Sequence, residues 1–446
     1  MKQNPPDLTR TIAQFAVQTG NGDIPFELLD HAKTAFLDWL GVAFAGSRDP
    51  LVEKLIRYAD LMGGHPRGSL VGLGIKKSLS QAALINGAAS HALDYDDTLM
   101  TYVGHPSVVL FPSLLGLSQW QGKSGLDFLN AYIIGVETAS AVGAAAGMGH
   151  YMAGWHATST IGHLASAAAC ARLLGLSETR TRNALGIAGT QACGLKRSFG
   201  TMCKPFHAGR ASQAGLMAAI LADDGFTAAP DILEAPLGFF HVFGGGGDPA
   251  AIRNLGNNWT LPKLAQKYHA SCHGTHSAID AVLAIVGENR LLPDDIHSIR
   301  IHASQLCLDA AGINEPATGL EGKFSIVYCV ANALLRGTTG IGAFTDEMVS
   351  HPDLRPFMQK VSVGLDAAMT PLGARVEVTT KAGRAFEHQT DIVRDIPGIE
   401  IKTEKIKHKF MDLATPVVGG EQAGRILDTV SCLETVDSLT PFIESL

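Results

Sequence analysis

Charged residues are scarce in this sequence, and positive ones are not in excess. Only 17% of the 446 residues are Asp, Glu, Lys or Arg, and the formal net charge is −7. A surface that binds nucleic acid needs a basic excess to meet the phosphate backbone, so we expect no nucleic-acid partner. Because 46% of the residues are hydrophobic, the chain has enough apolar material for a large buried core in two or three domains.

Signals for disulfides, export and membrane insertion are also missing. The seven cysteines are odd in number and show no CxxC spacing, which favours free thiols in a reducing compartment. The opening residues MKQNPPDLTR lack the apolar stretch of a signal peptide, and the Ala-rich run 138–147 is too short for a membrane span. We therefore expect a cytoplasmic protein that does not bind membranes. The GGGG run at 244–247 does not match a dinucleotide fingerprint, so we expect a loop there.

Apolar residues recur at helical spacing through the first 250 residues, and the pattern changes after about residue 265. The early segments that predict helices are 8–19, 25–46, 50–62, 80–93, 107–121, 126–142, 158–174, 178–192 and 210–224. Later, 297–304 alternates like a strand, 374–390 reads as a hairpin turning at 381–383, and 322–336, 404–414 and 420–436 read as helices. The sequence thus predicts a mainly α fold: a large all-helical domain, 1–268 and 402–446, interrupted by a smaller α+β lid domain, 269–401.

The segment HALDYDDTLMTYVGHPS, residues 91–107, places three carboxylates and two histidines directly after a small, apolar, helical run. Burial and neighbouring charges at such an edge of the core tune side chains for proton transfer. Asp94 and Thr98, four residues apart, share a helical face and can act on one ligand. Two other interpretations remain: a Mg²⁺ site for phosphoryl chemistry, and a solvated helix end.

Three further segments carry groups that could do chemistry. KRSFGTMCKPFHAGR, 196–210, holds five potential cations before the expected helix RASQAGLMAAILA, which indicates a carboxylate site with Lys204 in proton transfer, or else a solvated basic loop. GHYMAGWHATSTIGH, 149–163, contains His156 as either a base or a hydrogen-bonded structural residue. KYHASCHGTHSAID, 267–280, suits zinc by spacing, but its single cysteine disfavours a structural zinc site, and we expect no metal.

Six motifs in this order resemble the MmgE/PrpD family: HALDYDDT, GHPS, GWHATSTIG, GTMCKPFHAGRAS, KYHASCHGTH and GKFSIVYCVANALL. The resemblance covers nearly the whole chain. It implies a helical domain with an α+β lid, a homodimer, and chemistry on a small polycarboxylate next to a carboxylate, without metal or organic cofactor. The family includes 2-methylcitrate dehydratases, cis-aconitate decarboxylases and iminodisuccinate epimerase.

The branches of that family differ at two motifs. The dehydratase branch tends to read EWGHPSD where this chain reads YVGHPSV at 102–108, and the decarboxylase branch carries histidine where this chain has Cys272. In length and motif form the chain is most similar to the iminodisuccinate epimerase branch. The alternatives are a 2-methylcitrate dehydratase-like hydro-lyase, a cis-aconitate-type decarboxylase and a non-enzymatic tricarboxylate-binding protein.

The resemblance and the residue chemistry together give a set of expected site residues. The expected catalytic residues are His105, His156, Lys204, Tyr151 and Asp94. The expected substrate-binding residues are Thr98, Arg197, Lys267, Tyr328 and His276. An epimerase needs a base on one face of the substrate and an acid on the other, and which residue serves which face stays open. Cations must stabilise the enolate that forms between the two proton transfers.

Overall fold

A computed structural model of the chain describes residues 7–244 and 246–446. The expectations for the first six residues and for Gly245 in the 244–247 loop lie outside the described residues. The chain divides into two compact units, the first made of 1–266 and 399–446 and the second of 267–398. From the sequence we expected the two boundaries at 268/269 and 401/402. The prediction of a mainly helical fold with a small sheet in the later part is confirmed.

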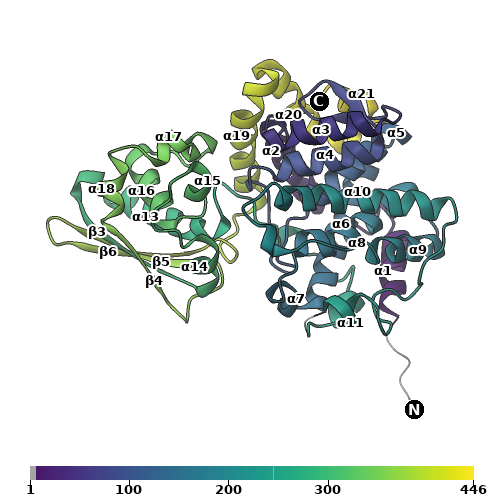
Figure 1. The fold of residues 1–446 in the computed structure, drawn as a ribbon, viewed down its shortest axis with the longest axis horizontal. Coiled ribbons are helices and arrows are strands. Elements are labelled where there is room, and N and C mark those ends of the chain that lie inside the picture. The colour runs from purple at the N-terminus through teal and green to yellow at the C-terminus, as the bar shows by residue number, and fades with distance from the viewer. Residues whose placement is uncertain (1–6, 245) are drawn as a thin grey trace, which may run out of the picture. The chain divides into compact units, whose positions relative to one another are not determined.

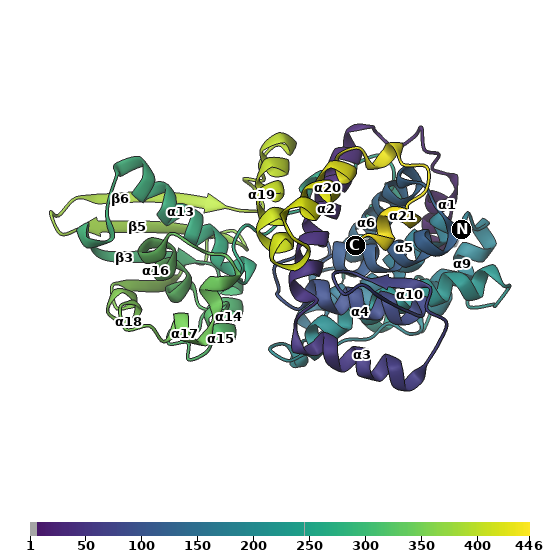
Figure 2. The same cartoon turned by 90° about the horizontal axis from the view of Figure 1, so that it is seen from above.

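The first unit is built of helices (Figures 1 and 2). It also contains one short hairpin, formed by strands β1 and β2. Its elements up to residue 266 are α1 (Leu8–Gln18), α2 (Glu27–Gly46), α3 (Pro50–Met62), β1 (Gly68–Leu70), β2 (Ile75–Lys77), α4 (Leu79–His91), α5 (Ser107–Gln121), α6 (Gly125–Ala146), α7 (Met148–Met152), α8 (Ala157–Leu174), α9 (Glu178–Gly189), η1 (Lys196–Ser198), α10 (Cys203–Asp223), α11 (Phe239–Phe243), α12 (Ala250–Arg253) and η2 (Leu261–Lys263). After the second unit the chain adds α19 (Ile399–Val418), α20 (Gly420–Ser431), η5 (Leu433–Thr435) and α21 (Thr440–Glu444).

Helix α10 is longer than the sequence predicted, and the difference matters for the site. It begins at Cys203 rather than near residue 210, so Lys204 lies in its first turn instead of in a preceding loop. Pro205 is compatible with this start, because the N–H that proline lacks has no partner in the first turn of a helix. The basic segment is therefore partly a helix N-terminus.

Helices α4, α5, α8 and α10 pack on one another and form the scaffold of the site. Helix α4 begins with a capping box in which Ser78 and Gln81 bond each other's backbone. Its small residues let α10 approach very closely: a Cβ added at Gly87 would lie 2.7 Å from the Cα of Gly209, and one at Gly209 would overlap the carbonyl oxygen of Leu84. Backbone therefore packs against backbone at this crossing, which fixes the spacing of the side chains at the ends of both helices.

Helix α6 contains residues 138–146 of the Ala-rich run that we expected to be too short for a membrane span. Among the described residues, it is the one helix long and apolar enough to cross a membrane by length and composition. In the structure, 94% of its most apolar window is buried inside the protein. It has the burial of a core helix, and α8 packs along it.

The second unit is a four-stranded mixed sheet with helices on it. Strand order is β4-β3-β5-β6, with β3 parallel to β4 and antiparallel to β5. Helix α13 packs on β5 and β6, and α16 on β4 (Figure 1). The elements are α13 (His273–Asn289), η3 (Pro293–Asp295), β3 (Ile296–Ala303), α14 (Gln305–Ala311), α15 (Gly319–Gly322), α16 (Ile326–Arg336), η4 (Ile341–Phe344), α17 (Asp346–Val349), α18 (Leu354–Met358), β4 (Val361–Leu365), β5 (Gly373–Thr380) and β6 (Ala385–Asp391).

The expected hairpin at 374–390 is present as β5 and β6, with Gly383 in the left-handed conformation at φ 78°. The expected strand at 297–304 is β3. Strand β4 was not predicted, because VSVGL is short and only half alternating in character. It joins the sheet through its pairing with β3.

The α4–α10 contact predicts a sharp stability difference between two glycines. We expect Gly209→Ala to destabilise the protein by roughly 1–3 kcal/mol, because the new methyl group must push two helix backbones apart. The matched control is Gly424→Ala in α20, where nothing lies within 4 Å of the added Cβ and a slight gain in stability is expected. Urea unfolding of the two variants measures both effects, and equal stabilities would contradict the close-packing argument.

Candidate active site

The segment between α4 and α5, residues 92–106, carries the acids and histidines of the first motif. Two of its residues have left-handed backbones, Asp94 at φ 52° and Val103 at φ 53°. Aspartate tolerates this conformation, but for a β-branched residue such as Val103 it is an outlier that persists only where the surrounding structure imposes it. Backbone bonds between Leu99 and Gly104 close the turn, and His105 follows directly. The loop is thus held in a specific shape just before its histidine.

Asp96 lies at the centre of the polar cluster and contacts two imidazoles. Its Oδ1 is 2.9 Å from His91 Nδ1, and its Oδ2 is 2.8 Å from His105 Nδ1. Burial by itself would raise the pKa of Asp96, but the two imidazoles outweigh burial and hold that pKa well below its ordinary value. Asp96 is therefore ionised, with His91 Nδ1 in hydrogen-bond geometry and His105 Nδ1 within ion-pair distance.

His156 is the N-cap residue of α8 and faces the same cluster. Its Nδ1 lies 3.2 Å from His207 Nδ1, and its ring stacks 6.1 Å from that of His91. Burial, followed by the neighbouring imidazoles and the Lys204 ammonium, holds the pKa of His156 well below its ordinary value. Burial also lowers the pKa of His207. A neutral imidazole at position 156 can accept or relay a proton near pH 7.

Lys204 and Asp94 form an ion pair at the accessible side of the cluster. Lys204 Nζ is 2.9 Å from Asp94 Oδ1, and 13% of each side chain remains exposed. Phe199 lies beneath the ammonium at 5.3 Å and contacts the edge of His156 at 4.9 Å. His105 is exposed to the same extent, 13%. These three polar side chains, and that of His207, are partly open to solvent and hence to a substrate.

Three helices begin around these side chains. Helix α5 starts after His105-Pro106, α8 starts after His156, and α10 starts at Cys203. The N-cap residue of each helix makes no side-chain capping bond, although Asp97 Oδ1 accepts from Ser107 N in α5 and Thr201 Oγ1 accepts from Cys203 N in α10. The contact of His105 N with Thr158 Oγ1 at 3.2 Å and that of His156 with His207 tie the three starts together. Free backbone N–H groups and helix dipoles at one place favour bound carboxylates.

Asp97 points to the opposite side of the segment from Asp96. Ser107 N lies 3.3 Å from its Oδ1 and Ser107 Oγ lies 2.5 Å from its Oδ2, with Tyr132 Oη 2.8 Å beyond Ser107. Burial, strengthened by the nearby Asp38, raises the pKa of Asp97 to about 8. Asp97 is therefore a protonated acid at neutral pH that bonds the start of α5.

The other expected residues of the first unit lie beside this cluster or at its border. Thr98 pairs through its backbone with Ala265, with both N···O distances at 2.9 Å. The ammonium of Lys196 lies 3.6 Å above the Tyr151 ring. Arg197 is exposed in η1. His105, His156, Lys204 and Asp94 therefore belong to one contact network, which runs through Asp96, His91 and Phe199.

Two further histidines of the 149–163 segment, His150 and His163, have structural partners. His150 bonds Phe243 O at 2.6 Å and Thr160 Oγ1 at 2.7 Å. His163 donates from Nδ1 to Ser159 O at 2.7 Å, and burial lowers its pKa to about 4. Both are hydrogen-bonded core histidines.

The second unit contains Lys267, His276 and Tyr328, all buried. His276 Nε2 lies 3.3 Å from Ser271 O, and burial with the neighbouring histidines and Lys267 holds the pKa of His276 well below its ordinary value. The Tyr328 hydroxyl donates to Ala343 O, and burial raises its pKa to about 12. All three residues belong to the second unit.

The zinc alternative for residues 267–280 finds no support in the contacts of its histidines. His269 bonds Thr339 Oγ1 at 2.7 Å and Asp280 Oδ1 at 3.0 Å, which uses both of its ring nitrogens. Within the described ranges, the side chains close enough to surround a metal are instead His91, Asp94, Asp96 and His105, whose ligand atoms lie within 4.8 Å of one another. Lys204 already supplies a cation to Asp94, so we assign this group to proton transfer.

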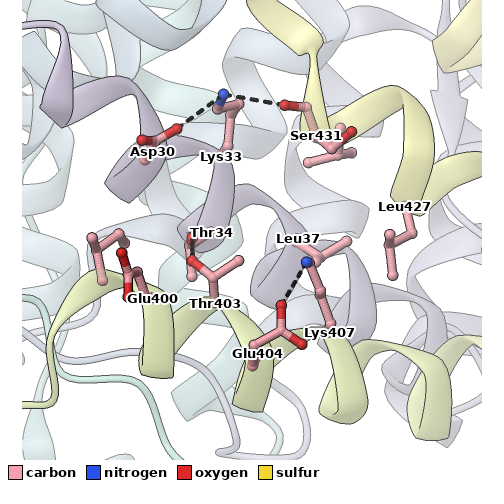
Figure 3. A pocket seen from close by; sticks show the side chains of 12 residues that line it. Asp30, Lys33, Thr34, Leu37, Glu400, Thr403, Glu404, Lys407, Leu427 and Ser431 are labelled. Carbon is pink, nitrogen blue, oxygen red and sulfur yellow. Dashed lines mark hydrogen bonds and ion pairs between the residues drawn. The ribbon is translucent and has the colours of Figure 1, made fainter.

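A separate pocket of about 350 Å³ lies between α2, α19 and α20, away from these residues (Figure 3). Both lysines that line it are paired with lining carboxylates: Lys33 with Asp30 at 3.1 Å and Lys407 with Glu404 at 2.7 Å. Leu37 and Leu427 give it an apolar wall. It offers no titratable cluster comparable to the one around Asp96.

Sequence reasoning missed Asp96, His91 and His207 as members of the site. We expected Asp96 and His91 to be scaffolding, because the family resemblance points instead to Asp94, Thr98 and His105 in that segment. The chain leaves the helix at Ala92, and the irregular backbone that follows brings Asp96 back to His91. The closely spaced acids of the DYD motif, Asp94 and Asp96, were the one signal in the sequence that could have pointed to Asp96.

Two family models match the chain, and together they span most of it. The MmgE/PrpD N-terminal domain matches residues 10–251, and the MmgE/PrpD C-terminal domain matches residues 269–435. A cis-aconitate decarboxylase of Aspergillus terreus is 28% identical over 98% of this chain and 96% of its own length. The cis-aconitate decarboxylase of Mus musculus is 27% identical over 94% of this chain and 86% of its own length.

The raised pKa of Asp97 predicts a pH-dependent loss of stability. The unfolded carboxyl ionises near pH 4 while the folded one stays protonated to about pH 8, so wild-type stability falls as pH rises between these values. Asp97→Asn imitates the protonated acid and should remove that slope, which is on the order of 1.4 kcal/mol per pH unit at most. Urea unfolding at pH 5 and pH 7 measures it, and parallel curves for the two proteins would contradict the assignment.

Proposed function

Because this chain belongs to the MmgE/PrpD family, we propose that it is a cofactor-independent enzyme that moves a proton at a carbon next to a carboxylate of a small polycarboxylate. The specific reaction we propose is epimerisation of an amino-dicarboxylate such as iminodisuccinate. An unprotonated imidazole takes the proton of one C–H bond, the electron pair moves into the adjacent carboxylate as an enediolate, and a protonated group on the other side, the Lys204 ammonium or a second imidazole in its protonated form, gives a proton to the opposite face. The net change is inversion of one stereocentre.

A single juxtaposition carries the proposal: a carboxylate-held imidazole and a neutral buried imidazole flank the same ring. His105 and His156 lie with ring centroids 4.6 and 6.1 Å from that of His91. Asp96 contacts His105 at its Nδ1 atom, whereas burial keeps His156 uncharged. His156 is itself buried, and the partly exposed His207, whose Nδ1 lies 3.2 Å from its own, would connect it to the accessible side. Two proton carriers in different environments are what an acid and a base on opposite faces require.

The enediolate needs positive charge around it, and the same place supplies it. The Lys204 ammonium lies at the accessible side of the cluster, and α5, α8 and α10 begin around the same side chains. These groups are already in position before the charge develops, so little reorganisation is needed when it forms. Asp94 orients the ammonium and offers an acceptor to a substrate nitrogen.

Decarboxylation is the second candidate, and the full-length similarity to cis-aconitate decarboxylases favours it. It would use the same charge stabilisation: the C–C bond to a carboxylate breaks, CO₂ leaves, and the carbanion takes a proton from a protonated imidazole. One acid then suffices in place of two proton carriers. The presence of both His105 and His156 leads us to place epimerisation first.

The proposed reaction is tested by incubating the enzyme in D₂O with one stereoisomer of iminodisuccinate and, in parallel, with cis-aconitate. We expect the stereoisomer to invert with one deuterium entering at the α-carbon, followed by NMR and chiral chromatography. Release of CO₂ from cis-aconitate without inversion of iminodisuccinate would replace epimerase by decarboxylase. A new C=C absorbance from a hydroxy-acid would indicate the dehydratase alternative.

Lys204→Met should lower turnover by about 10²-fold or more, because the variant loses the ammonium at the accessible side of the cluster. Thermal melting should show a folded protein. The matched control is Lys407→Met, which removes a lysine of the same unit at the pocket of Figure 3, where its partner is Glu404. Similar turnover in both variants would remove Lys204 from the mechanism.

A further inference from the structure

The Asp96 carboxylate serves two imidazoles, although the proposed reaction needs only His105. His91 Nδ1 lies 2.9 and 3.0 Å from the two oxygens of Asp96, and His105 Nδ1 lies 2.8 Å from Oδ2. The side chains of His91 and Asp96 are 0% and 1% exposed. Neither can meet a substrate directly, so any contribution to the chemistry must pass through His105.

The unused nitrogen of His91 reports on where its proton sits. His91 Nε2 is buried and has no hydrogen-bond partner among the described residues. A proton on that nitrogen would leave a buried N–H unsatisfied, which is costly in a site closed to water. The proton therefore belongs on Nδ1, where Asp96 accepts it, and the same carboxylate draws the proton of His105 to Nδ1.

Building on the proposed function, we propose that Asp96 and His91 are positioning residues for His105. Asp96 fixes the proton of His105 on Nδ1, so that an unprotonated Nε2 faces the accessible side of the site. His91 donates to both oxygens of Asp96 and keeps the carboxylate from rotating away. When Nε2 takes a proton from the substrate carbon, the pair of electrons stays on the substrate and Asp96 stabilises the imidazolium without taking its proton.

Two substitutions of His91 separate this role from simple space filling. Asn places an amide N–H near the position of Nδ1–H but is smaller than the ring, whereas Leu nearly fills the volume but cannot donate. We expect His91→Asn to keep kcat within about threefold and His91→Leu to lower it about tenfold or more, with KM unchanged in both. If the Leu variant turns over as fast as the Asn variant, the proposed role of His91 is overturned.

Asp96→Asn tests the carboxylate itself. An amide accepts from one Nδ1–H through its oxygen but turns its own N–H₂ toward the other ring, which forces a proton onto Nε2 there. We expect kcat to fall about 10²-fold or more while KM and the melting temperature hold. A kcat within threefold of wild type, in a folded variant, would overturn the proposal.

A measurement without substrate separates this inference from the proposed function. In protein labelled with ¹⁵N-histidine, the His105 signals, assigned by their loss in His105→Asn, should report a proton on Nδ1 in the wild type and a shift toward Nε2 in Asp96→Asn. A wild-type His105 protonated on Nε2 overturns the positioning role whatever the reaction proves to be. The expected tautomer in a protein that inverts no polycarboxylate supports the positioning and rejects the epimerase.

Discussion

The backbone contact between α4 and α10 is the constraint on which the site depends. Gly87 and Gly209 let the two helices meet without intervening side chains. One turn beyond Gly87 stands His91, and one turn before Gly209 stand Lys204 and Pro205. Because the helices are rigid over that distance, their close approach brings the acid-and-imidazole segment of one to the ammonium of the other. A wider crossing would leave the ion pair between Asp94 and Lys204 too long to form.

Two adjacent carboxyl groups show how the surroundings, rather than residue type, decide chemistry in this unit. Asp96 faces two imidazoles, and its pKa falls well below the ordinary value despite complete burial. Asp97 faces Ser107 and the field of Asp38, and its pKa rises to about 8. One therefore acts as an anion that holds a histidine, and the other as a neutral group that holds a helix start. The two side chains have different partners because the irregular backbone of the segment brings Asp96 to His91 and Asp97 to Ser107.

Much of this arrangement could be predicted from the sequence, since helical periodicity and four polar motifs are local signals. They indicated the mainly helical fold and the residues His105, His156, Lys204 and Asp94, which lie in one contact network in the structure. What could not be predicted depends on irregular backbone. The left-handed Val103 and the return of Asp96 to His91 follow from tertiary packing, which no spacing rule encodes. The early start of α10 was missed because basic residues and a proline imitate a loop.

The conformation of Val103 has a consequence for how activity relates to the state of the whole chain. A β-branched residue at φ 53° opposes the intrinsic preference of its own segment, so the surrounding helices must impose that shape. The loop that contains His105 therefore cannot fold before the helical unit folds, and it cannot stay folded after that unit unfolds. Activity is therefore expected only from the natively folded protein, and a compact but loosely packed intermediate would be inactive.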